Sequence, residues 1–504
     1  MLFRRSFLLS LLAISVTLRL FAQPAPIDDD AYGPPLDTLP GTGLEFDEAA
    51  YRAVPYKAPV TADTYANLPR AASLEQFTPT PGNQGPYSTC TAWAVAYHAR
   101  TMLHGIERGI TNRPQLDRLV FSPSFVYEKI KSPDAAPDCK SGTSIVNALE
   151  LLRTSGVPPY SYVPYSCGAT INTDAVRKAT EFPIVDYQIL FASDLPQDDP
   201  FKLLAIKKSL SEGSPVLIGF IVQQSFYRAG VTWNELDTDA GATGQHGRHA
   251  MVVVGYDDTK FGGAMRVMNS WGTKWGDQGF VWIPYADFNR NVFMAMQAYG
   301  KRPERQPYNV TPDNPVGTLP PLLAGEMRFE ERDGTPMRAR LAPPLAEGET
   351  QTRYLGYRLE RSYASGTRFR FYVKTSTQAY LYAFATDLTG EITQILPFAD
   401  NMSPLIGPDS TIAFPSERKV VRMDTTPGTD YLLLLYSEER LDLDALVTAM
   451  NANNGTLSLK IHQALGRRIV ADEFIEKAPD RIAFSLTDKT AGTVIPLMIE
   501  IPHH

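Results

Sequence analysis

Four polar residues occur along the chain in an order that suits nucleophilic catalysis by a thiol: Gln84, Cys90, His249 and Asn269. Cys90 directly precedes the helix-forming run TAWAVAYHA. A cysteine attacks a carbonyl carbon as a thiolate, and both a helix N-terminus and a neighbouring imidazolium favour that charged form. We therefore predict that Cys90 is a nucleophile at the start of a helix. The structural alternative is a cysteine buried on the apolar side of that helix.

The general base must be chosen among four histidines. His98 and His104 lie further along the helix that Cys90 begins, so neither is expected to face the sulfur. His246 lies in the glycine-rich stretch GATGQHGR, where a solvated residue is expected. His249 opens the apolar run HAMVVVGYDD, which predicts a strand that can hold an imidazole in one orientation. This context favours His249 over His246.

Two amide side chains complete the predicted site. Asn269 ends the strand-like run RVMN, and if its strand neighbours that of His249, its amide can orient the imidazole while Trp271 shields the bond from water. The alternative for Asn269 is an ordinary turn residue. Gln84 lies six residues before Cys90. Its amide, together with the backbone N–H of Cys90, would supply two donors to a tetrahedral oxyanion.

The N-terminus and the cysteine count predict an exported protein. Arg4 and Arg5 precede the apolar run 7–18, which is the pattern of a signal peptide, and we expect the mature protein to be periplasmic or extracellular. An exported chain with three cysteines is expected to pair two of them. Cys139 and Cys167 enclose a loop of ordinary closing length and are the favoured disulfide, which leaves Cys90 as the free thiol.

Composition limits the possible partners. The chain has 504 residues, 43% hydrophobic and 20% charged, with a formal net charge of −7, so we expect two folded units and no nucleic-acid partner. No apolar run beyond the N-terminal one approaches spanning length, so stable membrane insertion is not expected. Sequence spacing indicates no metal-ligand cluster and no cofactor. His462 is expected to be structural or solvated, and the terminal His503 and His504 to be solvated.

The chain is expected to divide into five parts. Residues 1–23 form the signal peptide, and 24–70 an extended N-terminal arm or a short pro-segment. Residues 71–302 form the domain that carries the four polar residues. The segment 303–344 is rich in proline and is expected to be a linker. Residues 345–504 are expected to form a β-rich accessory domain resembling a sandwich, interrupted by one helix at 441–452.

Within residues 71–302 the hydrophobic periodicity changes from helical to strand-like. Helices are expected at 90–103, 123–130, 143–154 and 201–210, and strands at 215–222, 250–256, 265–268, 280–283 and 292–298. A helical half followed by an antiparallel β half predicts an α+β fold with two lobes and a cleft between them.

These residues and motifs resemble the papain-like cysteine peptidases, the C1 peptidase family. The segment NSWGTKWGDQGF is similar to the family's Asn-Ser-Trp-Gly segment, HAMVVVGYDD to its histidine strand, and NQG…C to its oxyanion glutamine and nucleophile. The similarity covers roughly residues 70–300. The stretch SGTRFRFYVKTSTQAYLYAFATD weakly resembles a bacterial accessory domain of unknown function, DUF4384.

The resemblance implies a papain-like two-lobed fold and a role for each residue. Cys90 would be the nucleophile, His249 the acid and base, Asn269 the orienting residue and Gln84 the oxyanion donor. Gly142 falls where family members pair their backbone with an extended peptide substrate, and Trp271 is also expected to contact the substrate. The implied activity is hydrolysis of peptide bonds through an acyl-thioester on Cys90.

Some residues depart from the family pattern. Tyr87 and Thr91 replace the first cysteine and the aromatic residue of the signature Cys-Gly-[Ser/Ala]-Cys-[Trp/Tyr], and Ser141 replaces one glycine of a Gly-Gly pair. The chemistry is therefore better specified than the substrate preference. Two alternatives stay open: a catalytically weak peptide-binding relative, and an amidase or transpeptidase that acts on non-protein amides.

Overall fold

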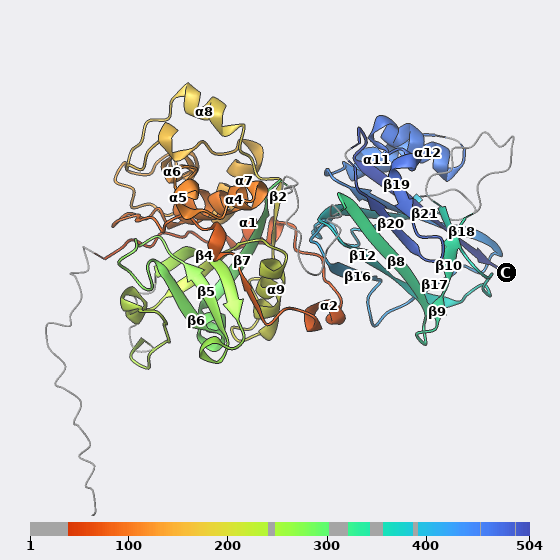
Figure 1. Cartoon of the computed structure of the whole chain (residues 1–504), viewed down its shortest axis with the longest axis horizontal. Coiled ribbons are helices and arrows are strands. Elements are labelled where there is room, and N and C mark those ends of the chain that lie inside the picture. The colour runs from red at the N-terminus through yellow and green to blue at the C-terminus, as the bar shows by residue number, and fades with distance from the viewer. Residues whose placement is uncertain are drawn as a thin grey trace, which may run out of the picture. The chain divides into compact units, whose positions relative to one another are not determined.

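The computed structural model describes residues 39–239, 247–301, 321–342, 356–386, 392–453, 455–488 and 490–504 (Figure 1). The predicted signal peptide and His246 lie outside the described residues. No helix in the described ranges is long and apolar enough to cross a membrane.

The first half of the peptidase-like region is helical. Residues 90–108 form one continuous helical stretch, consisting of α3 (Cys90–Ala92), the π-helical η4 (Trp93–Arg100) and α4 (Thr101–Arg108). Gly109 ends it in a left-handed conformation with φ 65°, as expected for a helix C-terminus. The predicted helix at 143–154 begins two residues later, as α7 (Ile145–Thr154), because the Ser144 side chain caps the Asn147 N–H.

The other helices of this region are α1 (Glu48–Ala53), α2 (Ala62–Ala66), α5 (Arg113–Leu116), α6 (Pro123–Ile130), α8 (Thr173–Ala179), α9 (Pro200–Ser211) and α10 (Tyr285–Asn291). Short 3-10 turns occur at η3 (Glu75–Phe77), η5 (Tyr160–Tyr162), η6 (Gln224–Arg228) and η8 (Lys260–Gly262). The predicted helix at 201–210 is α9, one residue longer at each end.

The second half forms an antiparallel sheet with the order β2-β7-β3-β4-β5-β6, and β1 pairs with β4. The strands are β1 (Ala71–Ser73), β2 (Asp186–Ile189), β3 (Val216–Val222), β4 (Gly247–Asp257), β5 (Ala264–Met268), β6 (Phe280–Pro284) and β7 (Val292–Tyr299). The helical and sheet halves share one hydrophobic core. The predicted α+β class is confirmed, and the strand that carries His249 starts at Gly247, so this histidine lies inside the strand.

The N-terminal arm is only partly extended. Residues 39–47 run without helix, and α1 and α2 then follow before β1 joins the sheet. The sequence prediction of an arm without regular structure is therefore wrong for 48–53 and 62–66. Both helices are short and begin at side-chain caps, Asp47 and Thr61, which a search for long periodic patterns does not detect.

The C-terminal region is a sandwich of two sheets. One has the order β10-β11-β21-β18-β13-β14, and the other β16-β12-β8-β20-β19. Their strands are β8 (Leu323–Glu331), β9 (Pro336–Met337), β10 (Ala339–Leu341), β11 (Gly356–Leu359), β12 (Arg368–Thr375), β13 (Ala379–Thr386), β14 (Ile392–Leu396), β15 (Leu405–Ile406), β16 (Ser410–Phe414), β17 (Val421–Arg422), β18 (Gly428–Ser437), β19 (Ile475–Lys477), β20 (Ile482–Leu486) and β21 (Val494–His503).

One prediction for this region is wrong, and another is incomplete. The linker was expected to reach residue 344, but β8 begins at Leu323 and pairs with β12 and β20, because LAGEMRFEE alternates as a strand. The helix predicted at 441–452 is present as α11 (Leu443–Asn451), and a second helix, α12 (Leu457–Leu465), was not predicted. They pack on Leu433 and Leu435, on the outer face of β18. Short 3-10 turns η9 (Gly466–Arg468) and η10 (Asp472–Phe474) follow.

The terminal histidines differ from each other. His504 is exposed as expected, whereas His503 is only 4% exposed, so the prediction that it is solvated is wrong. His503 is the last residue of β21 and pairs with Gly428 of β18. A central strand carries its final side chain into the sandwich, which residue position alone does not reveal.

Candidate active site

His249 and Asn269 meet through the pairing of their strands. His249 lies in β4, Asn269 directly follows β5, and these two strands are neighbours in the sheet. His249 Nε2 lies 2.8 Å from Asn269 Oδ1, and both residues are fully buried. The Ser270 N–H also donates to Asn269 Oδ1 at 2.7 Å, which fixes that atom as an acceptor. His249 Nε2 therefore carries the proton of the neutral ring, and Nδ1 presents a lone pair.

Aromatic rings cover this hydrogen bond. The Trp271 ring centroid lies 4.8 Å from that of His249, and the Tyr227 ring stacks on the indole at 4.9 Å with a 5° interplanar angle. Trp271 is 4% exposed. The indole thus lies beside the imidazole, where the sequence predicts it, and Tyr227 is a contributor that sequence reasoning missed.

Cys90 begins the helical stretch and is buried among backbone amides. Burial raises the pKa of its thiol, while hydrogen bonds from the backbone of Ala250, Gly43 and Thr91 act in the opposite direction. Ala250 directly follows His249, so the sulfur lies beside the histidine strand. All three cysteines of the chain are described, and Cys90 is the free one.

The imidazole is also neutral in this arrangement. Burial lowers the pKa of His249 to about 4, and the hydrogen bond with Asn269 opposes that effect. His249 Nδ1 is buried without a hydrogen-bond partner among the described residues. Of the other histidines described in this region, His98 is buried in the helix, and His104 lies 3.3 Å from Glu107.

Gln84 is held with its amide N–H groups pointing at carbonyl oxygens. Ser270 Oγ donates to Gln84 Oε1 at 2.6 Å. Gln84 Nε2 then donates to Tyr87 O at 2.7 Å and to Gly41 O at 2.8 Å. Ser270 is a positioning residue that the sequence search missed, although it lies inside the Asn-Ser-Trp segment.

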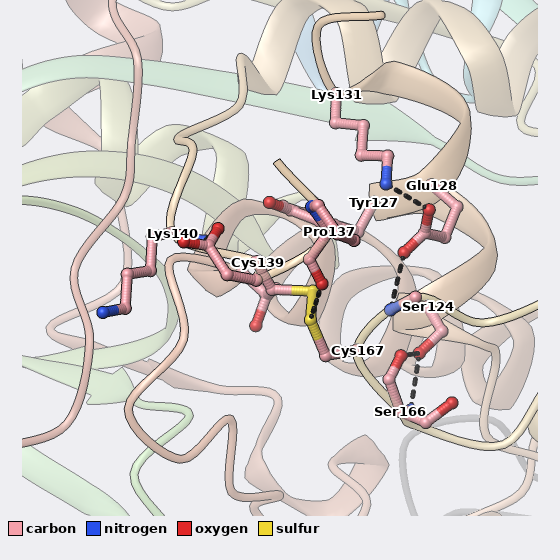
Figure 2. Close-up of a disulfide and its surroundings, with 12 residues drawn as sticks. Ser124, Tyr127, Glu128, Lys131, Pro137, Cys139, Lys140, Ser166 and Cys167 are labelled. Carbon is pink, nitrogen blue, oxygen red and sulfur yellow. Dashed lines mark hydrogen bonds and ion pairs between the residues drawn. A yellow bond between two sulfur atoms is a disulfide. The ribbon is translucent and has the colours of Figure 1, made fainter. Parts of the chain in front are cut away.

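The loop that carries Gly142 is fixed from two directions. Cys139 and Cys167 form a disulfide with a Cα–Cα distance of 5.8 Å, and Figure 2 shows it beside Tyr127 of α6. Tyr127 Oη donates to Ser141 O at 3.0 Å, and Cys139 O accepts from Ser88 N at 2.8 Å. These contacts fix the backbone that leads into Gly142 and tie it to the turn before Cys90.

Thr91, which replaces the aromatic residue of the family signature, has a structural role. It is fully buried, and its hydroxyl donates to Thr143 O at 2.8 Å. This bond ties the helix of Cys90 to the segment that follows Gly142. Two residues further on, the ring centroid of Trp93 lies 4.8 Å from that of Tyr165.

Residues 41–46 of the N-terminal arm lie between these elements. Glu45 N donates to Thr143 O at 3.1 Å, and Thr143 N donates to Gly43 O at 2.9 Å. On the sheet side, Leu44 N donates to Arg248 O at 3.0 Å. The arm therefore bonds both to the Gly142 loop and to the residue before His249, and Leu44 is buried in the shared core.

The arm fits because two of its residues have no side chain. A Cβ on Gly41 would overlap the carbonyl oxygen of Tyr87, and one on Gly43 would overlap Ser88. A Cβ on Gly142 would lie 2.7 Å from Gly43 O. The arm segment at Gly43 and the loop segment at Gly142 approach at backbone distance. The predicted substrate position at Gly142 is therefore occupied by the protein's own arm.

Two family models match the chain. The papain family cysteine protease model matches residues 129–300, and the model of a domain of unknown function, DUF4384, matches residues 362–440. The resemblance predicted from the sequence is thereby confirmed, with a papain-family segment followed by a DUF4384 segment. The first match includes His249 and Asn269 but starts after Gln84 and Cys90, so the assignment of those two residues depends on the geometry above.

The similar proteins and structures carry the names of cysteine proteases or of peptidase C1-like proteins. The chain is 29% identical over 210 residues to an uncharacterized peptidase C1-like protein of Acanthamoeba polyphaga mimivirus, covering 40% of this chain and 63% of that protein. It is 26% identical over 180 residues to cathepsin C of Schistosoma mansoni, covering 33% and 39%. The chain thus spans less than two thirds of the length of these relatives. Xylellain, a cysteine protease from Xylella fastidiosa, aligns with 21% identity and a TM-score of 0.42 over 53% of this chain and 97% of its own.

Proposed function

We propose that the protein is an exported cysteine peptidase in which Cys90 is the nucleophile and His249 the acid and base. The observation that carries this proposal is the buried bond between His249 Nε2 and Asn269 Oδ1, which leaves Nδ1 as the basic atom. The sulfur of Cys90 lies against the backbone amide of Ala250, the residue that follows His249. The family match over residues 129–300 supports the same reaction class.

The proposed reaction has two halves. His249 Nδ1 takes the thiol proton, and the sulfur of Cys90 attacks the peptide carbonyl carbon and forms a C–S bond. Gln84 Nε2 and the Cys90 N–H stabilise the oxyanion. The C–N bond then breaks, and the amine leaves with the proton from His249. Water attacks the thioester in the second half, which releases the carboxylic acid and restores the thiol.

We further propose that the arm segment 41–46 inhibits the peptidase in the full chain. Its backbone takes the hydrogen bonds that an extended peptide would take, from Thr143 and from the amide of Gln84. Burial raises the pKa of the Cys90 thiol and lowers that of His249, and both effects favour the neutral, unreactive pair. The arm is accordingly a pro-segment in function.

The test uses a valine in place of an arm glycine. Gly43→Val should expel the arm, because a side chain there overlaps Ser88. The variant should hydrolyse a fluorogenic peptide at least about tenfold faster than the unmodified chain under reducing conditions and should expose Cys90 to iodoacetamide. Gly230→Val is the matched control, since a Cβ at Gly230 meets nothing within 4 Å.

Each possible result separates the hypotheses. Unchanged hydrolysis and labelling in a folded Gly43→Val variant would contradict inhibition by the arm. Labelling of Cys90 and peptide binding without hydrolysis would favour the peptide-binding alternative. Hydrolysis of cell-wall peptides but not of casein would favour the amidase alternative.

Export has a separate test. The arginine pair and apolar run at the N-terminus support it, and the disulfide between Cys139 and Cys167 suits an oxidising compartment. Expressed in a bacterial host, the protein should be recovered from the periplasm or medium without residues 1–23. Cytoplasmic recovery with an intact N-terminus would contradict export.

A further inference from the structure

The C-terminal sandwich holds His503 in a fixed orientation. The strand β21 pairs with β18 on one side, and on the other side Ser365 N donates to His504 O at 2.7 Å. The His503 side chain is 0% exposed, and its Nδ1 lies 2.9 Å from Ser365 Oγ. One ring nitrogen is therefore held by a hydroxyl group while the other points elsewhere.

The second nitrogen, Nε2, points at two carboxylates. It lies 3.5 Å from Asp430 Oδ2 and 3.9 Å from Asp424 Oδ1. Asp430 pairs with Ile501 in the register that pairs His503 with Gly428, so Asp430 and His503 project from the same face of neighbouring strands. Nε2 is buried and forms no hydrogen bond with any residue that the structure describes.

We propose that His503, Asp424 and Asp430 bind a divalent cation, and specifically Zn²⁺, at the edge of the sandwich. One ligand atom from each residue lies within 4.8 Å of the others. Tetrahedral zinc with bonds of about 2.0–2.2 Å places its ligand atoms about 3.3–3.5 Å apart. The observed 3.5 and 3.9 Å therefore need only a small contraction around the ion.

The side chains differ in how much they can move. His503 is buried and already oriented, which is the usual arrangement of a histidine ligand whose other nitrogen is hydrogen-bonded. The Asp424 side chain is 44% exposed and can adjust, and its Oδ1 accepts the Thr426 N–H at 2.7 Å, which limits its rotation. Three protein ligands leave the fourth position of the ion for water.

The electrostatics also favour a cation here. Two carboxylates and a buried imidazole nitrogen face one another here, and a divalent cation is attracted to such a set of ligand atoms. His503 Nε2 forms no hydrogen bond with either carboxylate among the described residues. Imidazole and carboxylate together are ligands that suit zinc.

The site has an entry path. Asp424 and Asp430 line a cavity of about 300 Å³ whose walls are mostly apolar and include Phe369, Leu432 and Ile501. An ion can reach the carboxylates from this cavity, and the apolar walls strengthen its attraction to them.

The test titrates Zn²⁺ into the full chain with Cys90 replaced by alanine, so that the catalytic thiol cannot bind metal. Calorimetry should show one ion per chain. His503→Gln and Asp424→Asn should each weaken Zn²⁺ binding by at least about tenfold. His504→Gln is the matched control, because this neighbouring histidine is exposed and should bind no zinc.

Two measurements keep the result interpretable. Asp424→Asn changes an exposed side chain, so it reports on binding even if His503→Gln destabilises the sandwich. Co²⁺ in place of Zn²⁺ should give visible d–d bands that disappear in Asp424→Asn. Absence of stoichiometric Zn²⁺ binding, or binding unchanged in both ligand variants, would overturn the proposal.

Discussion

Two buried histidines, His249 in the peptidase region and His503 in the sandwich, differ in what faces their second nitrogen. Both have one ring nitrogen held by a short hydrogen bond, to Asn269 in the first case and to Ser365 in the second. His249 is held by an uncharged amide, which favours a neutral ring able to exchange a proton. His503 faces two carboxylates, which favour a bound positive charge. The charge of the neighbours thus separates a proposed general base from a proposed metal ligand.

The largest expected effect is on peptide hydrolysis, and it should depend on His249 and not on His503. In the Gly43→Val background, His249→Ala should reduce peptide hydrolysis by at least about 10⁴-fold, because the base is lost, and should leave Zn²⁺ binding unchanged. His503→Gln should do the reverse. Hydrolysis rates and zinc titrations on both variants check this, and His246→Ala is the control expected to retain activity. Activity surviving in His249→Ala but not in His246→Ala would overturn the assignment of the base.

The next effect concerns the oxyanion. Gln84→Ala in the same background should lower kcat by about 10²–10³-fold, since one of two donors is lost, with a smaller change in KM. Steady-state kinetics on a fluorogenic peptide measure it. A change confined to KM would instead assign Gln84 to ground-state binding.

The pH dependence of stability reports whether His249 is neutral in the folded protein. Burial lowers the pKa of His249 to about 4 and that of His98 to about 3, so the unfolded chain binds more protons between about pH 6.5 and 4. The contribution of these histidines to the free energy of unfolding is therefore complete above pH 6.5, and it is lost as the pH falls through this window. His249→Gln should reduce the slope by about 1.4 kcal/mol per pH unit.

Tryptophan fluorescence can follow this unfolding selectively. All five tryptophans of the chain lie between residues 93 and 282, and the sandwich has none. Denaturant titrations at several pH values therefore measure the peptidase region. An equal slope in the wild type and in His249→Gln would mean that His249 is not held neutral.

The smallest expected effect comes from a substitution that gives His249 a carboxylate neighbour, as His503 has. Asn269→Asp places a carboxylate beside His249 and should raise the pKa of that imidazole from about 4 to about 5–7. NMR titration of the ring checks the shift, with Asn269→Gln as the uncharged comparison. A pKa that stays near 4 would show that burial outweighs the added charge.

The sequence identifies the site residues that lie in or next to predictable helices and strands, because the order of those elements brings the residues together. His249 and Asn269 follow from two adjacent apolar strands, and Cys90 from the start of a helix. Periodicity predicts these elements within a few residues, because the buried face of each is apolar. The fold class follows from the same pattern.

What the sequence did not predict depends on long-range contacts. His503 and Asp430 are 73 residues apart and meet only because β18 and β21 pair, with Asp424 added by the turn before β18. The contact between Gly43 and Ser88 likewise depends on a segment without periodicity passing over a loop. Ser270 was missed because its role appears only when Gln84 lies beside it.

The glycine-rich arm has a quantitative consequence for any external ligand. A tethered segment competes at an effective concentration in the millimolar range for short flexible linkers, whatever the amount of enzyme in solution. Substrates and inhibitors should therefore bind the full chain with a higher apparent Kd than a chain with the arm released. The apparent Kd is the intrinsic Kd divided by the fraction of molecules whose site is open. Cleavage or displacement of residues 41–46 would then change the apparent affinity for every ligand by one common factor.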